Sequence, residues 1–254
     1  MVSSGNEEID LLLGGGLDAG TCTLIMGATG VGKTVLTTQV ALAAARRGER
    51  AILFLFDERT RTFVERARKL DISVDEALAS DRLVLQQIDP TELSPGAFAA
   101  RVVEAVEEEG ARLVGIDSLT GYLNAMPAEQ LLTIHLHELF SYLGQRGVTS
   151  LLTLAQHAPF SESSVVADVS YLADAIILLR YFEAMGEVRQ AVSILKRRSG
   201  AHEKTIREYR IREGGIKVGT PLHEFQGVLS GTPEYLGAAG PLLGRTSAGD
   251  PKPA

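Results

Sequence analysis

The sequence is poor in cysteine, in positive charge and in long apolar runs. Its one cysteine, Cys22, cannot form a disulfide within the chain, which favours a reducing compartment. The net charge is −7, so the composition gives no general basic surface of the kind that holds duplex DNA. No apolar run reaches the roughly 18 residues of a membrane span, and the first residues lack the regions of a secretory signal. We therefore expect a cytoplasmic protein without a membrane partner, for which DNA is a disfavoured ligand.

Residues 27–34, GATGVGKT, are the clearest functional signal. They match the phosphate-binding pattern G-x-x-x-x-G-K-[ST] at every fixed position, and they lie between a β-prone apolar run at 21–26 and a helical pattern at 35–46. Glycines let backbone N–H groups approach phosphate oxygens, and the helix N-terminus adds unpaired donors. Lys33 is expected to meet the β- and γ-phosphates, and the Thr34 hydroxyl is expected to bind Mg²⁺.

Apolar runs alternate with helical patterns through most of the chain. This alternation predicts an α/β protein with a parallel sheet and crossover helices. The later strands follow one another without helices between them, which predicts an antiparallel extension at one edge of the sheet. The predicted strands are 21–26, 51–56, 83–88, 113–116, 148–155, 175–182 and 188–195, with a further pair between 206 and 218.

The composition changes near Gly237. Beyond this residue the sequence is mostly Gly, Pro, Ala and Ser, with too little apolar content to form a core. We expect one domain over 1–236 and a disordered tail over 237–254.

Acidic residues end two of the predicted strands. Asp117 ends the run LVGID, and Asp57 and Glu58 follow the apolar run at 51–56. The C-terminal ends of parallel strands share one edge of a sheet, so these acids should converge on the phosphate loop. Asp117 has the pattern of a Walker B acid that anchors Mg²⁺ through water. One acid of the adjacent pair would serve as general base and the other would contact the metal; a strand-end cap and a surface turn are the alternatives.

Basic residues end a later strand. Lys196, Arg197 and Arg198 lie at its end, and His202 and Lys204 lie just beyond. Such a cluster would neutralise charge that develops on a γ-phosphate, as an arginine finger does. A solvated basic strand end fits the composition equally well, so the residues alone leave both interpretations open.

Together these segments resemble the KaiC-like branch of the RecA superfamily of ATPases. The resemblance covers about residues 9–231 and rests on LLGGGL, GATGVGKT, FDER, IDSL and KRRSGAHEKTIRE. The last segment is the most specific, and the likeness is greatest to the second ATPase domain of KaiC proteins. The chain differs at Asp57, where the family often has glutamate, and at Leu70, where it has an aromatic residue near the adenine. The resemblance implies a RecA-like P-loop NTPase fold and a homohexameric ring with Mg²⁺ and ATP at the subunit interfaces.

The resemblance also implies roles for individual residues. Glu58 would be the general base, and Thr34 and Asp57 would approach Mg²⁺. Ser170 would be an autophosphorylation site, at the first position of a Ser-Thr pair whose second position is Tyr171 here. The residues implied at the phosphates are Thr29, Gly30, Val31, Gly32, Lys33 and Thr34, and those implied at the neighbouring subunit's nucleotide are Lys196, Arg197, Arg198, His202 and Lys204.

Several functions fit these residues. An ATP-hydrolysing ring, with or without serine autokinase activity, uses all of them. A RecA-like or helicase-like motor on single-stranded DNA is a second hypothesis, against which the acidic balance and the lack of an aromatic and basic stripe both weigh. A nucleotide-gated scaffold with slow turnover is a third hypothesis. Copies of this chain are the expected partners, and other protein partners are compatible with all three.

Overall fold

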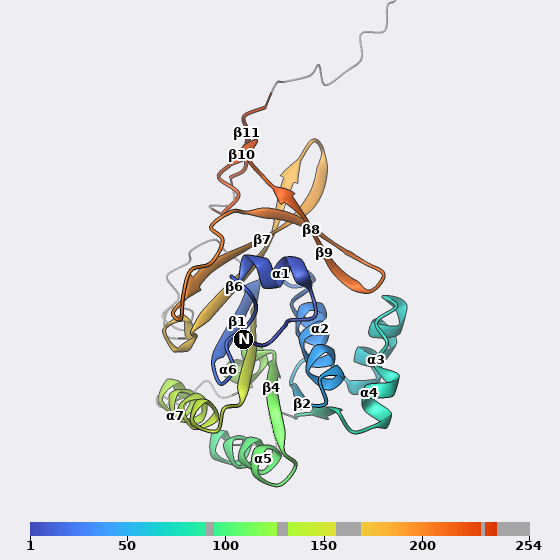
Figure 1. Ribbon diagram of the computed structural model, residues 1–254, viewed down its shortest axis with the longest axis vertical. Helices are drawn as coiled ribbons and strands as arrows, with labels where there is room; N and C mark the ends of the chain where they lie inside the picture. Colours follow the sequence, from blue (N-terminus) through green and yellow to red (C-terminus); the bar gives the residue numbers. More distant parts are fainter. Residues whose placement is uncertain (90–93, 126–131, 156–168, 230–231, 238–254) are drawn as a thin grey trace, which may run out of the picture.

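The computed structural model describes residues 1–89, 94–125, 132–155, 169–229 and 232–237 (Figure 1). The predicted tail beyond 237 lies outside these residues, and the domain boundary at 236 stays a prediction. The strands are β1 Cys22–Gly27, β2 Arg50–Leu55, β3 Leu83–Gln87, β4 Ala111–Asp117, β5 Thr149–Ala155, β6 Ala175–Ala184, β7 Glu187–Arg197, β8 Arg207–Arg212, β9 Gly215–Pro221, β10 Phe225–Gln226 and β11 Glu234–Tyr235. The helices are α1 Glu7–Leu12, α2 Lys33–Arg46, α3 Thr60–Lys69, α4 Asp75–Ala79, α5 Pro95–Glu107, α6 Leu119–Ala125 and α7 Leu132–Gln145.

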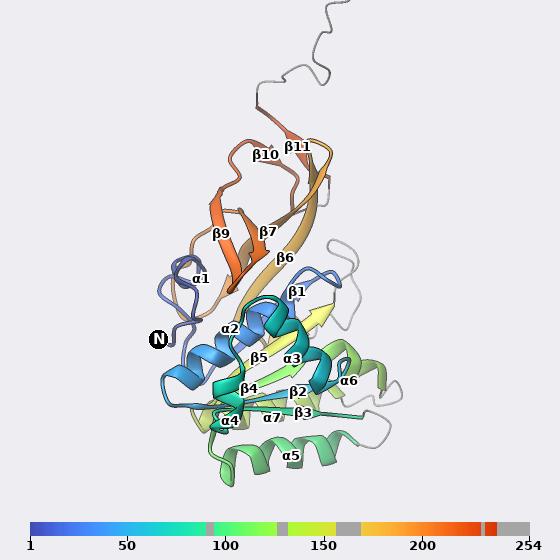
Figure 2. The same ribbon diagram turned by 90° about the vertical axis from the view of Figure 1, so that its right-hand side faces the viewer.

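The centre of the fold is a nine-stranded sheet in the order β3-β2-β4-β5-β1-β6-β7-β8-β9. The strands from β3 to β6 pair in parallel, and β7, β8 and β9 continue the sheet in antiparallel fashion. Figure 2 shows β6 and β7 extending beyond the parallel strands toward β10 and β11. The predicted architecture, a mostly parallel sheet with flanking helices and an antiparallel extension at one edge, is confirmed.

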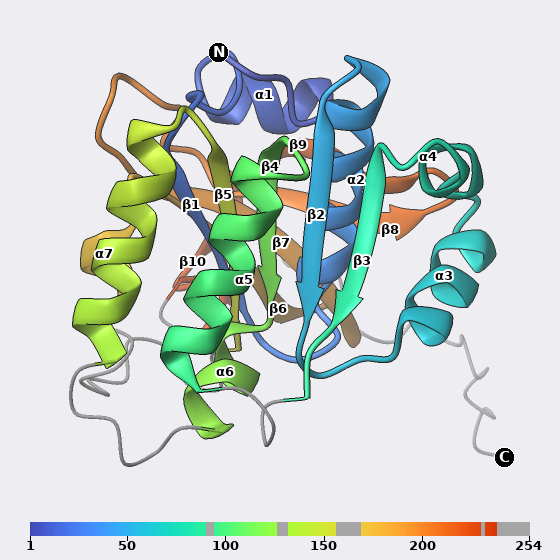
Figure 3. The same ribbon diagram turned by 90° about the horizontal axis from the view of Figure 1, so that it is seen from below.

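Helices cover both faces of the parallel strands. Figure 3 shows α5 and α7 on one face and α2 on the other. Every residue of β1 is buried, which explains why this strand has a continuous apolar run instead of alternation. On the α5 face, Phe54 and Phe98 pack edge to face with ring centroids 5.3 Å apart, a favoured geometry for aromatic pairs. Packing of helices on both faces of the sheet fixes the positions of the parallel strands and of the residues at their ends.

Local sequence sets several element boundaries. Ser94 caps α5 by accepting a hydrogen bond from the Ala97 N–H group, and Pro95 occupies the first turn. The β6–β7 hairpin turns at Met185 and Gly186, whose φ angles are 53° and 76°, as a primed hairpin turn requires. The short elements α4, α6, β10 and β11 were not predicted, because so few residues carry no clear periodicity. None of the described helices is long and apolar enough to cross a membrane.

Candidate nucleotide-binding site

A cavity of about 970 Å³ opens at the C-terminal edge of the parallel strands. This volume lies at the upper end of the range for small-molecule sites. The cavity brings together the phosphate loop, which joins β1 to α2, and the acids that follow β2 and end β4. Its lining includes Thr29, Gly30, Gly32, Lys33, Thr34, Val35, Asp57, Glu58, Arg66, Leu70, Asp117, Ser118 and Ile211.

Two glycines allow the phosphate loop to pack closely on the sheet. A Cβ atom on Gly27 would lie 2.2 Å from the carbonyl oxygen of Leu179 on β6. Gly32 has a φ of 107°, and a Cβ atom there would lie 2.7 Å from Cδ1 of Ile211 on β8. A side chain at position 27 would push against the β6 backbone, and one at position 32 would displace the Ile211 side chain and strain the positive φ angle. The loop backbone therefore rests directly on β6 and β8, while Gly30 and Gly32 line the cavity.

Lys33 is the first residue of α2, and it is held by the loop that it follows. Its Nζ donates hydrogen bonds of 2.9 Å to the carbonyl oxygens of Gly27 and Ala28. Burial lowers the pKa of Lys33, and the negative charges of Asp117 and Asp57 oppose that shift. Two neutral carbonyl groups orient the ammonium without cancelling its charge, so the lysine is placed to attract an anion at the helix N-terminus.

Two of the predicted acids lie side by side because β2 and β4 are neighbouring strands. Asp57 accepts a hydrogen bond from the Ser118 hydroxyl, and Asp117 accepts one of 2.5 Å from the Thr153 hydroxyl. A Cβ atom on Gly121 would lie 2.4 Å from Oδ1 of Asp57. The first turn of α6 therefore needs a glycine at 121 to leave room for the Asp57 carboxylate.

The donor set fits Mg²⁺ bound to a nucleotide. Thr34, Asp57 and Asp117 all line one cavity, and their side chains carry oxygen, which is the ligand atom that Mg²⁺ prefers. The described hydrogen bonds engage one oxygen of each carboxylate. The anion-attracting lysine and the oxygen donors thus face the same space.

Glu58 forms an ion pair with Arg66 of α3. The guanidinium of Arg66 also lies 5.4 Å from the ring centre of Phe63, which is buried. Both members of the pair line the cavity. The fixed arginine therefore keeps the Glu58 carboxylate at the site, a contact that the sequence did not predict.

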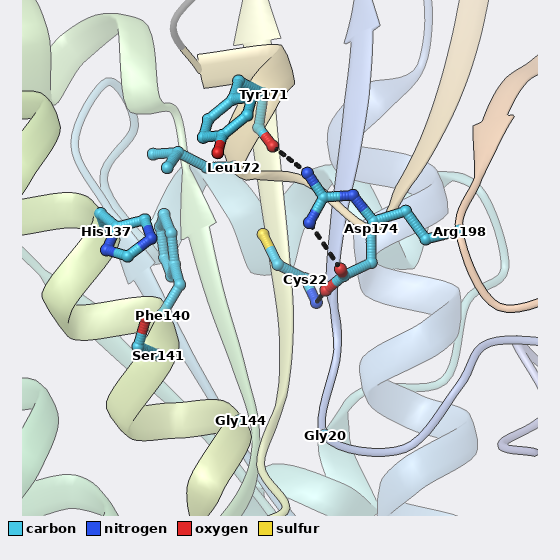
Figure 4. Close-up of a pocket in the computed structure, with 10 residues that line it drawn as sticks. All are labelled: Gly20, Cys22, His137, Phe140, Ser141, Gly144, Tyr171, Leu172, Asp174 and Arg198. Atoms are coloured by element: carbon cyan, nitrogen blue, oxygen red, sulfur yellow. Dashed lines mark hydrogen bonds and ion pairs between the residues drawn. The ribbon is translucent and has the colours of Figure 1, made fainter.

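The basic cluster lies beside the start of β6. The Nζ atom of Lys196 donates a hydrogen bond of 3.0 Å to the carbonyl oxygen of Ser170, in a helical turn at 169–172. Burial lowers the pKa of Lys196, and the positive charge of Arg198 adds to the effect. Figure 4 shows the Arg198 guanidinium between the Tyr171 carbonyl oxygen, at 2.6 Å, and the Asp174 carboxylate, at 3.4 Å.

The basic cluster lies near the N-terminal ends of the parallel strands, whereas the phosphate loop lies at their C-terminal ends. Ala175, at the start of β6, pairs with Arg197, whereas Leu179, further along β6, pairs with Gly27 at the start of the loop. Four residues along β6 separate the Arg197 pairing at Ala175 from the Gly27 pairing at Leu179, a span of roughly 13 Å at about 3.3 Å per residue. That span exceeds the reach of a lysine or arginine side chain. The cluster is therefore out of reach of the phosphate loop in its own chain.

The side chain of Arg197 is directed into its own chain. It forms an ion pair of 3.1 Å with Asp18, and it is 2% exposed. It also donates to the carbonyl oxygens of Leu13 and Ala201. In this conformation the guanidinium is engaged within its own chain, and the contact of Arg197 with a neighbour's nucleotide stays a prediction. His202 and Lys204 lie in the next loop, half-buried and exposed respectively.

We expect Arg197→Met to lower the free energy of unfolding by about 3 kcal/mol, because the change leaves part of a buried ion-pair network without its cation. Arg198→Met is the matched control. Its ion pair is 47% exposed on the arginine side, so a loss of about 1 kcal/mol or less is expected. Urea denaturation of both variants gives the comparison, and equal losses would contradict the structural role of Arg197.

The same ion pair predicts a dependence of stability on pH. Burial raises the pKa of Asp18, but hydrogen bonds from Arg197 and Ser199 outweigh it, so the pKa is lowered overall. A carboxylate with a lowered folded-state pKa stabilises the protein above its unfolded pKa of about 4, and this contribution is lost as the pH falls through the folded-state value. Asp18→Asn should therefore lower the free energy of unfolding at neutral pH. As the pH is lowered into the acid range, the free energy of unfolding should fall less in this variant than in the wild type.

Sequence reasoning missed three residues of the site. Ser118 and Arg66 hold the predicted acids, and Tyr209 of β8 donates a hydrogen bond to the Val31 carbonyl oxygen in the phosphate loop. Tyr209 entered the sequence analysis only within the 206–218 strand pair. A tyrosine at a buried strand position needs a hydrogen-bond partner, and this requirement is the one feature of the sequence that indicates a contact for Tyr209. The identity of each partner depends on packing.

Comparisons with known proteins identify the family of this chain. The family profile described as "ATPase: KaiC" matches residues 2–223. Circadian clock protein KaiC3 of Synechocystis sp. is 30% identical over 237 residues, covering 92% of this chain and 46% of the relative. Circadian clock oscillator protein KaiC of Acaryochloris marina is 29% identical over 233 residues, covering 91% of this chain and 44% of the relative. The chain spans about half the length of these curated relatives. With its phosphate loop, strand-end acids and mostly parallel sheet, the chain belongs to the KaiC family of RecA-like P-loop ATPases.

Proposed function

We propose that this chain binds Mg²⁺ and ATP and hydrolyses the ATP at interfaces between copies of itself arranged in a ring, a homohexamer by resemblance to the family. One observation carries the proposal: the phosphate loop lies at the C-terminal ends of the parallel strands, and the basic cluster lies near their N-terminal ends. In a head-to-tail assembly the surface of one chain that carries the phosphate loop meets the surface of the next chain that carries the basic cluster. Such an assembly forms a ring when the rotation closes. Each site would then contain parts of two chains.

In the first half of the site, main-chain N–H groups of residues 29–34 and the Lys33 ammonium would hold the phosphates. Mg²⁺ held by Thr34, Asp57 and Asp117 would neutralise charge on the β- and γ-phosphates. Glu58 would accept the proton of the attacking water, oriented by its ion pair with Arg66. The apolar side chains of Leu70 and Ile211, which line the same cavity, provide a wall for the adenine.

In the second half of the site, Lys196 and Arg198 of the adjoining chain would supply positive charge to the γ-phosphate. Arg198 is 47% exposed and is held by a carbonyl oxygen and one carboxylate, which phosphate oxygens can replace. Charge supplied from a second chain makes turnover depend on assembly. His202 and Lys204, from the loop after β7, would extend the same contact surface.

Autophosphorylation of Ser170 is a second proposed activity. The Ser170 carbonyl oxygen accepts a hydrogen bond from Lys196, so the serine lies at the edge that would face the neighbour's nucleotide. In this reaction the Ser170 Oγ would bond to the γ-phosphorus, ADP would leave, and the hydroxyl proton would pass to Glu58 of the neighbour. Mass spectrometry after incubation with Mg²⁺ and ATP tests it, and absence of phosphate on Ser170 would exclude it.

We expect the protein to assemble when nucleotide binds. Light scattering coupled to size-exclusion chromatography, with and without Mg²⁺ and ATP, should show a shift from small species to a ring. A protein saturated with nucleotide that stays monomeric would contradict the shared site. A turnover rate raised by single-stranded DNA would favour a motor, and an assembled ring with very slow turnover would favour a nucleotide-gated scaffold.

A further inference from the structure

Tyr209 links the antiparallel part of the sheet to the phosphate loop. Its side chain is 1% exposed, and its hydroxyl donates a hydrogen bond to the carbonyl oxygen of Val31. Burial, together with the nearby Tyr181 hydroxyl, raises the pKa of Tyr209, so the phenol stays protonated and remains a donor. A buried phenol needs a partner, and here that partner is the main chain of the loop.

The direction of this hydrogen bond fixes the direction of an N–H group. The Val31 carbonyl and the Gly32 N–H belong to one planar peptide group, and the described cis peptide bond lies elsewhere, after Asp117. In a trans peptide these two groups point in opposite directions. Val31 is fully buried, while Gly32 lines the nucleotide cavity. A carbonyl held inward by Tyr209 therefore directs the Gly32 N–H toward the cavity.

Other contacts hold β8 and β9 in place against the loop and α2. The side chain of Ile211, two residues after Tyr209, packs on Gly32. Gln39 of α2 donates to the Gly214 carbonyl oxygen at 3.2 Å and accepts from the Ile216 N–H group at 3.0 Å. Tyr209 thus belongs to a strand pair, β8 and β9, that is hydrogen-bonded to α2, the helix that follows the loop.

We infer that Tyr209 is a positioning residue for nucleotide binding. Its hydroxyl holds the Val31 carbonyl so that the Gly32 N–H faces the β-phosphate of a nucleoside diphosphate or triphosphate. The inference rests on the proposed function, which supplies the ligand. Without the hydroxyl, the peptide between Val31 and Gly32 is free to turn, and nucleotide binding must then reorder it.

The test is Tyr209→Phe, which removes one oxygen atom and keeps the ring. Because the net worth of one hydrogen bond corresponds to about a tenfold change in an equilibrium constant, we expect the Kd for Mg²⁺ and ADP to rise about tenfold by calorimetry. KM for ATP should rise in parallel while kcat at saturating ATP changes little, since the hydroxyl acts on binding and not on the chemical step.

Tyr181→Phe is the matched control. The Tyr181 hydroxyl lies 3.2 Å from the position of a Cβ atom on Gly30, so it borders the same loop, and within the described residues it makes no hydrogen bond. We expect its nucleotide affinity to equal that of the wild type. Unchanged affinity in Tyr209→Phe would overturn the inference, and so would a variant that fails to fold by circular dichroism, because the hydroxyl would then hold the fold and not the loop. A wild-type protein that binds no ADP would instead refute the proposed function.

Discussion

Replacing Glu58 with glutamine should lower ATP turnover by about 10²- to 10⁴-fold, the usual contribution of a general base, and leave ATP binding intact. Glutamine keeps the size of the side chain and a carbonyl oxygen for Arg66, but it cannot accept a proton from the attacking water. The phosphate loop and the Mg²⁺ ligands are unchanged in this variant. Phosphate release measures the loss of turnover, and calorimetry with ATP measures the retained binding.

The matched control for this prediction is Glu65→Gln. Glu65 is a glutamate of α3 that also pairs with an arginine, but its ion pair with Arg61 is exposed on the surface of the helix. We expect its turnover to equal that of the wild type. Normal hydrolysis by Glu58→Gln would show that another group takes the proton, and Asp57 would be the next residue to test.

Mixing two inactive variants should restore activity. We expect Arg198→Ala alone to lose about 10³-fold in turnover, the lower end of the effect of removing an arginine finger. In mixed rings of Arg198→Ala and Glu58→Gln chains, some sites pair an intact Glu58 with an intact Arg198 from the next chain. Random equal mixing makes about a quarter of the interfaces intact, because each site takes its two halves from different chains in a head-to-tail ring.

The measurement is phosphate release by the mixed sample relative to the sum of the separate variants. Recovery toward a quarter of wild-type turnover supports a site built from two chains. The control is a double variant that carries both changes in one chain, mixed with Glu58→Gln, which can form no intact site. No recovery in the test mixture would place Arg198 outside the neighbour's site, whereas activity in that control would show that turnover does not require Glu58.

The sequence by itself determined the phosphate loop and the framework around it. The spacing of residues 27–34 is local, so eight consecutive residues specify a phosphate cradle before any packing is known. The apolar runs fixed the parallel strands. The convergence of Asp57 and Asp117 then followed, because parallel strands end at the same edge of a sheet and the structure pairs β2 with β4.

Only the tertiary structure decided what the distant residues do. The antiparallel direction of β7 placed Lys196 and Arg198 at the edge opposite the loop, and packing turned Arg197 toward Asp18, 179 residues earlier. The hydrogen bond from Tyr209 to Val31 likewise joins residues 178 positions apart. Such contacts depend on strand order and on the shape of the packed interior, which no local pattern of residue types encodes.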